Sequence, residues 1–594
     1  MAGCAGSDAD TDSTVTDNIP QTPQQDSPPQ QPVAQPVLAD AEVEFDEGLV
    51  VEESAAVNTT LGIGDADDMN IAHRERRCTT ANYAGASGAT QDVLISGFVH
   101  CPPVATDWNT EGYAAIDENK FKLVGVEPLS TFSVDVDRAS YANVRRFLND
   151  DRLPPPDAVR IEEMINYFRY DYPQPTGDDP LAIVTEVSDC PWNPGHRLVH
   201  IGLQARSIDL TTAPPSNLVF LLDVSGSMNN SNKLPLVKQS MRLLVDQLRP
   251  QDRVAIVVYA GAAGLVLPST SGSEKQDILD AIDRLNAGGS TAGGAGIRLA
   301  YDTAAENYQH GGNNRVILCT DGDFNVGESS DGAMERLIEE RRGEGVFLTV
   351  LGFGMGNYQD SKLETLADQG NGNYGYIDDI LEAKKMLVNE MGGTMYTIAK
   401  DVKVQVEFNP AHVKAYRLVG YENRLLAAQD FNDDTKDAGE MGSGHTVTAL
   451  YELITADSDE AVPGVDELRY QDISPRDDAG DEMLTVKFRY KDPDGDTSKL
   501  IVRHLEDRRV PLARASDNFR FSAAVAAFGM LLRDSEYTGD IGFDDVRQMA
   551  RNARGDDPEG YRGEFLRLVE KAELLDGQAG GGDGGPAPRI QGER

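Results

Sequence analysis

The middle of the chain alternates between continuous apolar runs and amphipathic stretches. Apolar runs of strand length occupy residues 217–223, 253–259, 315–320 and 346–352. Amphipathic stretches of helical length occupy residues 233–248, 274–285, 294–308 and 332–342. Continuous apolar runs are typical of parallel strands buried on both faces, and strands alternating with helices are typical of an open, doubly wound sheet. The pattern predicts an α/β domain over residues 211–395, which ends with a helix near 379–391.

The segments on either side of this domain carry a different pattern. Before it, strand-like segments occupy residues 131–137, 181–186 and 198–203, and helical segments occupy 140–148 and 161–168. After it, strands are expected at 402–408, 413–420, 445–453, 483–490 and 500–504, and helices at 517–533, 543–552 and 561–574. The earlier strands have no evident sheet of their own, so we expect them to join the later ones in a β-sandwich. The predicted fold is therefore a doubly wound α/β domain inserted in, or flanked by, a β-sandwich with C-terminal helices.

The two ends of the chain lack sustained hydrophobic periodicity. Residues 1–75 are rich in Pro, Gln, Asp and Ser and are expected to form a disordered tether. A small Gly/Ala-rich segment follows at 76–112, and a flexible tail is expected at 577–594. The remaining parts are an N-terminal associated region at 113–210 and a C-terminal β-sandwich with helices at 396–576.

The charge of the chain argues against binding to nucleic acid or to an anionic membrane surface. The 594 residues carry a formal net charge of −44. Binding to nucleic acid needs basic patches, and binding to an anionic membrane surface needs the same. We therefore expect neither nucleic acid nor a lipid surface as a partner, whereas cation binding, solubility or a generally acidic proteome would each account for the acidity.

The residues around Cys4, near the start of the chain, bear on whether the protein is lipidated. Small residues precede Cys4, and a polar run follows it at once. This arrangement resembles a bacterial lipobox, whose cysteine is lipidated after cleavage of a signal peptide, although the apolar region that should precede it is absent. The resemblance implies a lipoprotein attached to a membrane of the cell envelope through an N-terminal lipid only. The alternative is an accidental cysteine near a disordered end.

The other cysteines are Cys78, Cys101, Cys190 and Cys319, and their spacing matches no zinc-binding pattern. Cys78 and Cys101 flank a Gly/Ala/Thr-rich segment and would close a disulfide loop in an oxidising envelope. Cys319 ends an apolar strand, so we expect it to be a buried thiol.

Oxygen-bearing side chains follow the first apolar strand at a regular spacing. Asp223, Ser225 and Ser227 alternate toward one side, and Gly226 permits a tight turn between them. Ligands of open α/β sheets bind beyond the carboxyl ends of the strands. A carboxylate and two hydroxyls are hard donors that suit Mg²⁺ or Mn²⁺.

Two further segments should converge on the same edge of the sheet. One is the loop at 288–294, which contains Ser290 and Thr291, and the other is Asp321, directly after the later apolar strand. The alternative interpretation is an acidic turn that binds nothing. Agreement of three separate segments favours a metal site over that alternative.

Together these residues resemble the metal-ion-dependent adhesion site of von Willebrand factor type A domains. The resemblance implies that Ser225 and Ser227 bind the ion directly, and that Thr291 does so when a ligand is engaged. It implies that Asp223 and Asp321 act directly or through water. Ser290, beside Thr291, is the alternative hydroxyl at that position.

The resemblance extends beyond the site. The segments 135–141, 153–163, 321–327 and 430–440 are similar to those of a bacterial envelope family. In that family a type A domain sits between a conserved N-terminal region and a C-terminal region without an assigned role. The likeness covers about residues 113–575 and implies an architecture more than an activity.

The chemistry of the site favours binding over catalysis. Hydroxyl ligands leave an ion with much of its positive charge and an open position, which an acidic side chain of a partner can complete. The chain has neither a GxxxxGK[ST] loop nor a GxSxG elbow. We therefore expect a metal-dependent protein-binding or adhesion module of the bacterial envelope, not an enzyme. Its partner would be a protein with an exposed Asp or Glu. The alternative is an assembly or chaperone-like factor that works with a separate AAA+ ATPase. The sequence does not indicate an oligomeric state.

Overall fold

The computed structural model describes residues 111–580 except 290–292, 323–330, 356–359, 435, 437, 463–479 and 494. All of them belong to one compact unit, Pro102–Arg594. Cys4, Cys78, Cys101 and the predicted tether lie outside the described residues. No helix in the described part of the chain is both long and apolar enough to cross a bilayer.

A six-stranded sheet with the strand order β10-β9-β8-β5-β6-β7 forms the centre of the α/β domain. Its strands are β5 (Ser216–Asp223), β6 (Arg253–Tyr259), β7 (Ala263–Ser271), β8 (Asn313–Thr320), β9 (Phe347–Phe353) and β10 (Tyr374–Ile377). Neighbouring strands run parallel except for β7, which pairs antiparallel with β6 at one edge. The central position of β5 accounts for its uninterrupted apolar sequence, since both of its faces are covered.

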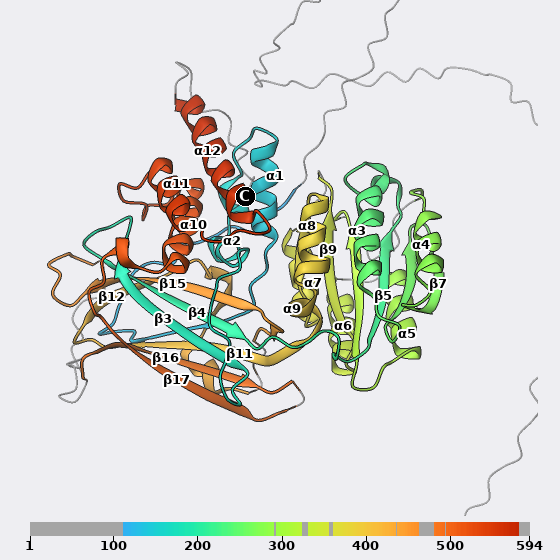
Figure 1. The fold of residues 1–594 in the computed structure, drawn as a ribbon, viewed down its shortest axis with the longest axis horizontal. Coiled ribbons are helices and arrows are strands. Elements are labelled where there is room, and N and C mark those ends of the chain that lie inside the picture. Colours follow the sequence, from blue (N-terminus) through green and yellow to red (C-terminus); the bar gives the residue numbers. More distant parts are fainter. Residues whose placement is uncertain are drawn as a thin grey trace, which may run out of the picture. The chain divides into compact units, whose positions relative to one another are not determined.

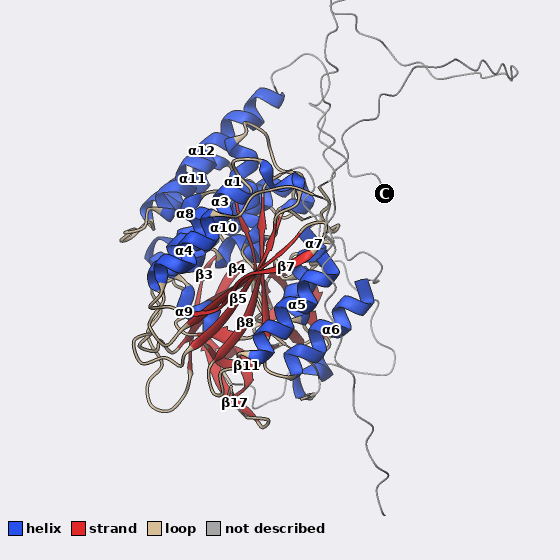
Figure 2. Cartoon of the chain, turned by 90° about the vertical axis from the view of Figure 1, so that its right-hand side faces the viewer, coloured by secondary structure: helices blue, strands red, loops and turns tan. Residues whose placement is uncertain are grey.

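Helices cover the two faces of this sheet (Figure 2). One face carries α3 (Leu234–Gln247), α4 (Lys275–Asp283) and α8 (Ile380–Lys384), and the other carries α5 (Gly293–Glu306), α6 (Asp331–Gly343) and α7 (Asp360–Gln369). The strands β7 and β10 and the helix α7 were not predicted. The expected single helix at 379–391 is instead α8, a π-helical turn at Lys385–Asn389 and α9 (Met391–Met395). Gly392 and Gly393 lie in this last short helix, and glycine disfavours a regular continuation.

The strands outside the α/β domain form two sheets. One has the order β1-β12-β15-β4-β3, and the other has the order β13-β2-β11-β16-β17 with β14 beside β11. The strands that precede the α/β domain are β1 (Lys122–Leu123), β2 (Leu129–Ser133), β3 (Leu181–Asp189) and β4 (Arg197–Ala205). Those that follow it are β11 (Thr397–Phe408), β12 (Val413–Val419), β13 (Leu425–Leu426), β14 (Met441–Gly442), β15 (Thr446–Thr455), β16 (Glu482–Lys491) and β17 (Ser498–Glu506).

Early and late strands pair within both sheets, as the sequence predicted. In the first sheet β4 pairs antiparallel with β15, and in the second β2 pairs antiparallel with β11. The chain thus leaves one sheet after β4, builds the α/β domain and returns in β11 of the other sheet. The predicted fold class is confirmed, with the α/β domain as an insertion in the sandwich. Between the two sheets lies a core that includes Phe132, Ile201, Val404 and Phe488, each almost fully buried.

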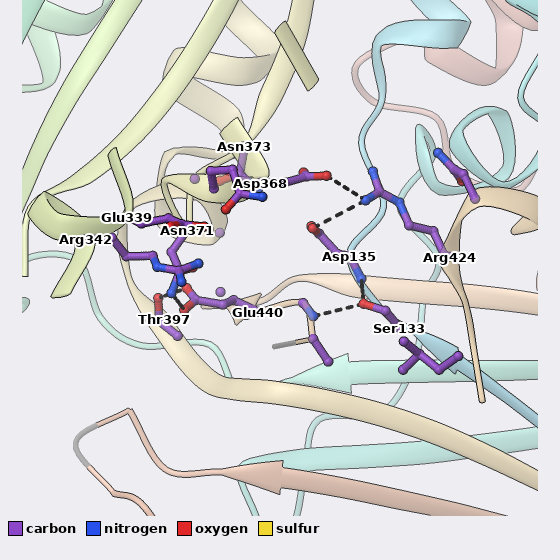
Figure 3. A pocket seen from close by; sticks show the side chains of 18 of the residues that line it. Ser133, Asp135, Glu339, Arg342, Asp368, Asn371, Asn373, Thr397, Arg424 and Glu440 are labelled. Carbon is purple, nitrogen blue, oxygen red and sulfur yellow. Dashed lines mark hydrogen bonds and ion pairs between the residues drawn. The ribbon is translucent and has the colours of Figure 1, made fainter. Parts of the chain in front are cut away.

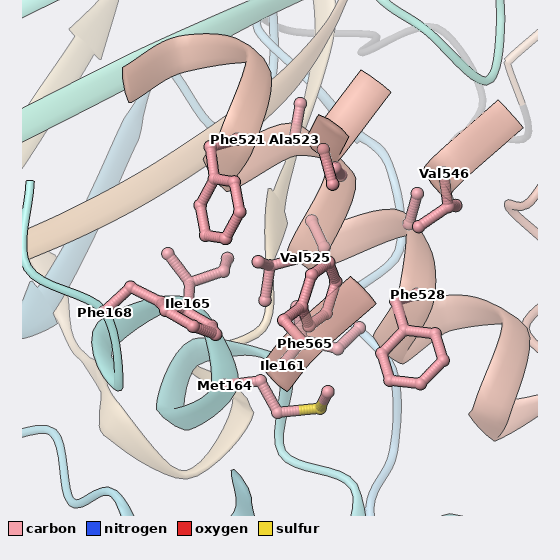
Figure 4. Packing of buried hydrophobic residues seen from close by; sticks show 14 of the residues in the cluster. Ile161, Met164, Ile165, Phe168, Phe521, Ala523, Val525, Phe528, Val546 and Phe565 are labelled. Atoms are coloured by element: carbon pink, nitrogen blue, oxygen red, sulfur yellow. The ribbon is translucent and has the colours of Figure 1, made fainter. Parts of the chain in front are cut away.

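A layer of helices covers the outer face of the first sheet (Figure 1). It consists of α2 (Ile161–Asn166), α10 (Asp517–Arg533), α11 (Phe543–Asn552) and α12 (Tyr561–Gly580). Figure 4 shows Met164 and Ile165 of α2 in one apolar cluster with Phe528 of α10 and Phe565 of α12. The hydroxyl of Ser516 accepts a hydrogen bond from the backbone N–H of Phe519 at 3.1 Å and caps the start of α10.

One helix, α1 (Ala139–Asn149), connects the α/β domain with this helical layer. Ala139 and Ala142 belong to the apolar core on one face of the α/β sheet, whereas Tyr141 and Val144 belong to the core of the helical layer. Arg145 forms ion pairs with Asp378 and Glu382 of the α/β domain and with Glu564 of the helical layer. Because buried ion pairs demand defined geometry, α1 fixes the α/β domain against the rest of the unit.

Candidate metal centre

The predicted motif forms a tight turn directly after β5. Asp223 is fully buried, and its Oδ1 accepts a hydrogen bond from the backbone N–H of Ser225 at 2.8 Å. The hydroxyls of Ser225 and Ser227 lie 2.9 Å apart, with Ser225 buried and Ser227 exposed. The turn therefore gathers a carboxylate and two hydroxyls at the carboxyl end of the central strand.

The loop before α5 lies against this turn. The backbone N–H of Gly226 donates to the carbonyl of Gly289 at 3.0 Å, and the N–H of Gly288 donates to the carbonyl of Val224 at 2.7 Å. Gly289 has a φ of +89°, a conformation that glycine adopts without strain. Thr291 lies outside the described residues. The two hydrogen bonds hold Gly288 and Gly289 against the turn, and Gly289 precedes Thr291 by two residues.

Asp321 follows β8, the strand that pairs in parallel with β5. Its side chain is fully buried, and its Oδ2 accepts a hydrogen bond from Lys233 Nζ at 2.8 Å. Lys233 is itself 5% exposed and precedes α3. The structure thus places a buried ammonium group beside one of the predicted metal ligands.

Gly354 makes room for the stem of Lys233. A Cβ atom at this position would lie 2.4 Å from Cε of Lys233, and the φ of Gly354 is +80°. Both facts require glycine, because a larger residue would displace the lysine and strain the backbone. Neither Lys233 nor Gly354 was predicted from the sequence to take part in the site. The one available signal was a lone basic residue, Lys233, at the start of the helix predicted after the serine motif.

The charge balance of the site favours a cation. Burial raises the pKa of Asp223 to about 6, with a further contribution from the negative charge of Asp321, while hydrogen bonds from Ser225 lower it. Asp223 Oδ2 is buried and has no hydrogen-bond partner among the described residues. The Tyr259 hydroxyl lies close enough to the Asp223 carboxyl to lower this pKa. A buried carboxylate oxygen without a partner is unfavourable unless a cation or proton reaches it.

These groups fit a hard divalent cation. Asp223, Ser225, Ser227 and Asp321 come together at one edge of the sheet, and all of them offer oxygen atoms. No cluster of three or more His, Cys, Asp or Glu side chains suited to a metal occurs among the residues the structure describes. The metal-ligand roles of the five residues, Thr291 included, stay predictions.

The remaining candidate groups lie elsewhere. Cys190 and Cys319 are buried free thiols, which confirms the prediction for Cys319. His200 is buried in the helical layer, where its ring nitrogens contact the hydroxyls of Tyr172 at 2.6 Å and Ser522 at 3.0 Å. Burial lowers the pKa of His200 to about 3, so this histidine is neutral at pH 7.

Three family models match the chain. The model of the von Willebrand factor type A domain matches residues 217–388, and a von Willebrand factor model matches 107–200. The model of the C-terminal region of the uncharacterized protein YfbK matches residues 393–575. The protein YfbK of Escherichia coli (strain K12) is 46% identical over 474 residues, which are 78% of this chain and 81% of that protein.

Solved structures are more distant. The von Willebrand factor type A from Catenulispora acidiphila has a TM-score of 0.36 at 16% identity, and the match covers 65% of this chain and 89% of that one. Proximal thread matrix protein 1 from the mussel byssus, with a zinc-occupied MIDAS motif, has a TM-score of 0.25 at 28% identity. That match covers 30% of this chain and 45% of the mussel protein.

Proposed function

Because this chain belongs to the YfbK family of von Willebrand factor type A domain proteins, we propose that it is a metal-dependent protein-binding module. The site would hold Mg²⁺ or Mn²⁺ through Asp223, Ser225, Ser227, Thr291 and Asp321. The buried Oδ2 of Asp223, which lacks a hydrogen-bond partner, is the observation that carries this proposal. When bound, the ion would supply a positive centre with an open position for a carboxylate oxygen.

The charges around the site support an acidic partner. Asp223 and Asp321 contribute two negative charges, and Lys233 offsets one of them through its contact with Asp321. The serine hydroxyls add no charge. The side chains therefore neutralise a divalent cation only in part, and an Asp or Glu of a partner protein would complete the balance.

We further propose where this binding takes place. The polar segment after Cys4 would serve as a spacer between a lipid anchor and the domains described above. A protein held in this way would present the metal site to partners in the bacterial cell envelope. The carboxylates and hydroxyls described at the site are oxygen ligands suited to a cation, which supports a role in binding.

Thermal melting of the full chain tests this proposal. We expect Mg²⁺ or Mn²⁺ at ten times its dissociation constant to add about 1.4 kcal/mol of stability relative to EDTA. For the melting of a domain of the size of the α/β domain, residues 211–395, that gain corresponds to a rise of about 3–5 °C in its melting temperature. Ser225→Ala removes one proposed ligand and should abolish the rise.

Ser273→Ala is the matched control. Ser273 is exposed and follows β7 near the start of β6, at the opposite end of the sheet from Asp223. This variant should respond to metal as the wild type does. An equal rise in wild type and Ser225→Ala, or no rise in the wild type, would contradict a metal centre at this turn.

A further inference from the structure

A cavity of about 370 Å³ lies at the other end of the α/β sheet, between that domain and the sandwich. Arg315 near the start of β8 and Arg342 of α6 line it from one side, and Thr397 and Glu440 line it from the other. Figure 3 shows polar side chains from both sides pointing into this space. Its size falls within the range of about 300–1,000 Å³ that is typical of small-molecule sites, which often form at domain junctions.

Arg315 is the unusual group in the wall. Arg315 is 2% exposed, and within the described part of the chain it donates one hydrogen bond, from Nη1 to the Thr349 hydroxyl at 2.8 Å. Its Nε is buried without a hydrogen-bond partner among the described residues, and the negative charge of Glu440 acts on it without a direct ion pair. Burial lowers the pKa of Arg315 to about 10. A buried guanidinium without a directly paired carboxylate is an unfavourable arrangement in a protein interior.

Other charged groups of the wall have partners or solvent. Arg424 forms ion pairs with Asp137, Glu364 and Asp368. The Glu440 carboxylate accepts hydrogen bonds from Asn371 and Thr397, each at 3.0 Å. Glu339 is exposed, so water and salt screen its charge. Arg315 is thus the charge in this wall that gains most from a ligand.

We propose that this cavity binds a small organic or inorganic anion, with a carboxylate or phosphate group that pairs with Arg315. A guanidinium group is suited to both groups because its planar donors match their oxygens. Arg342 and the amides of Asn371 and Asn373 supply further polar groups in the wall. The ligand would contact the α/β domain and the sandwich together. The site is separate from the metal centre, because Arg315 and Asp321 lie at opposite ends of β8, about 20 Å apart at the rise of a strand.

Melting of the full chain with inorganic phosphate, citrate or the neutral compound glycerol tests this inference. All samples contain EDTA and the same ionic strength, so that chelation by citrate and general salt effects do not enter. Because the ligand would stabilise the α/β domain and the sandwich together, we expect phosphate or citrate at ten times its dissociation constant to raise the melting temperature of the wild type by about 1–2 °C. Glycerol at the same concentration should leave it unchanged.

Two variants separate the anion site from a merely structural arginine. Arg315→Met removes the charge and should abolish the rise, while its melting temperature without ligand should equal or exceed that of the wild type. Asn373→Asp adds a negative charge to the wall without changing Arg315 and should weaken anion binding at least tenfold. Arg503→Met, at an exposed arginine of β17, should keep the full rise. No rise in the wild type at 10 mM anion, or equal rises in all four proteins, would overturn the proposal.

Discussion

The contact between Lys233 and Asp321 leads to a sharp prediction for metal affinity. Lys233→Met keeps an unbranched apolar stem over Gly354 and removes only the ammonium group. In the metal-free protein, Asp321 would then lose the cation that lies 2.8 Å from its Oδ2. The variant should be less stable without metal and should bind Mg²⁺ more tightly than the wild type.

The magnitude follows from the burial of the pair. The two side chains are 5% and 0% exposed, and removing one partner of such a buried pair costs about 3–5 kcal/mol. That loss corresponds to a melting temperature lower by about 6–20 °C in EDTA. A divalent cation would then offset the negative charge of Asp321. Recovery of even 1.4 kcal/mol on binding corresponds to about a tenfold lower dissociation constant for Mg²⁺.

Calorimetric titration with Mg²⁺ and melting curves in EDTA measure the two effects separately. Lys238→Met is the matched control, because Lys238 lies on α3 and donates to the backbone carbonyls of Asp283 and Leu285, not to a carboxylate. It should leave the Mg²⁺ affinity unchanged. A dissociation constant for Lys233→Met that stays within twofold of the wild type, or rises, would refute this account of the site's charge.

Three further predictions concern residues around the site and in the cores. Gly354→Ala should displace the Lys233 side chain, lower the free energy of unfolding by about 1–3 kcal/mol and tighten Mg²⁺ binding. Melting curves and calorimetric titration measure the two effects, and unchanged values would contradict the close packing. Burial lowers the pKa of His200 to about 3, whereas the ordinary pKa of a histidine is near 6.5. Between pH 3 and about 6.5 the unfolded chain therefore binds more protons at this residue than the folded protein does. The free energy of unfolding should therefore fall as the pH falls from about 6.5 toward 3, and urea denaturation should show a smaller fall for His200→Gln. Arg145→Met leaves buried carboxylates without their cation and should lower the free energy of unfolding by about 3–5 kcal/mol, whereas Arg152→Met, at an exposed position, should change it by less than about 0.5 kcal/mol in the same urea assay.

Local patterns were enough to predict most of the fold. The strands β5 and β8 are continuous apolar runs because both faces of a central parallel strand are buried. The strand β7 was missed because it lies at the edge of the sheet, contains Pro268 and exposes part of its side chains. The insertion was predictable, since the strands before the α/β domain needed partners.

In the candidate site, too, contacts between residues close in sequence were predicted, and contacts between distant residues were missed. Asp223, Ser225 and Ser227 are close in sequence, so their spacing alone predicted that they share one turn. The pairing of Lys233 with Asp321 joins residues 88 positions apart, and no local pattern encodes it. Arg315 was correctly placed in a strand. Its position in the wall of a cavity depends on how the α/β domain packs against the sandwich, which is a tertiary effect.

The insertion of the α/β domain has a consequence for the synthesis of the chain. Residues 206–396 separate β4 from β11, so a ribosome adding about 5–20 residues per second takes about 10–40 s to pass from one to the other. During this interval β2, β3 and β4 have left the ribosome without their later partners. The α/β domain can fold as it emerges and so shortens the loop that the sandwich must close. Nascent chains that end before residue 397 should therefore hold a protease-resistant α/β domain beside a protease-sensitive N-terminal segment, which limited proteolysis of stalled chains would reveal.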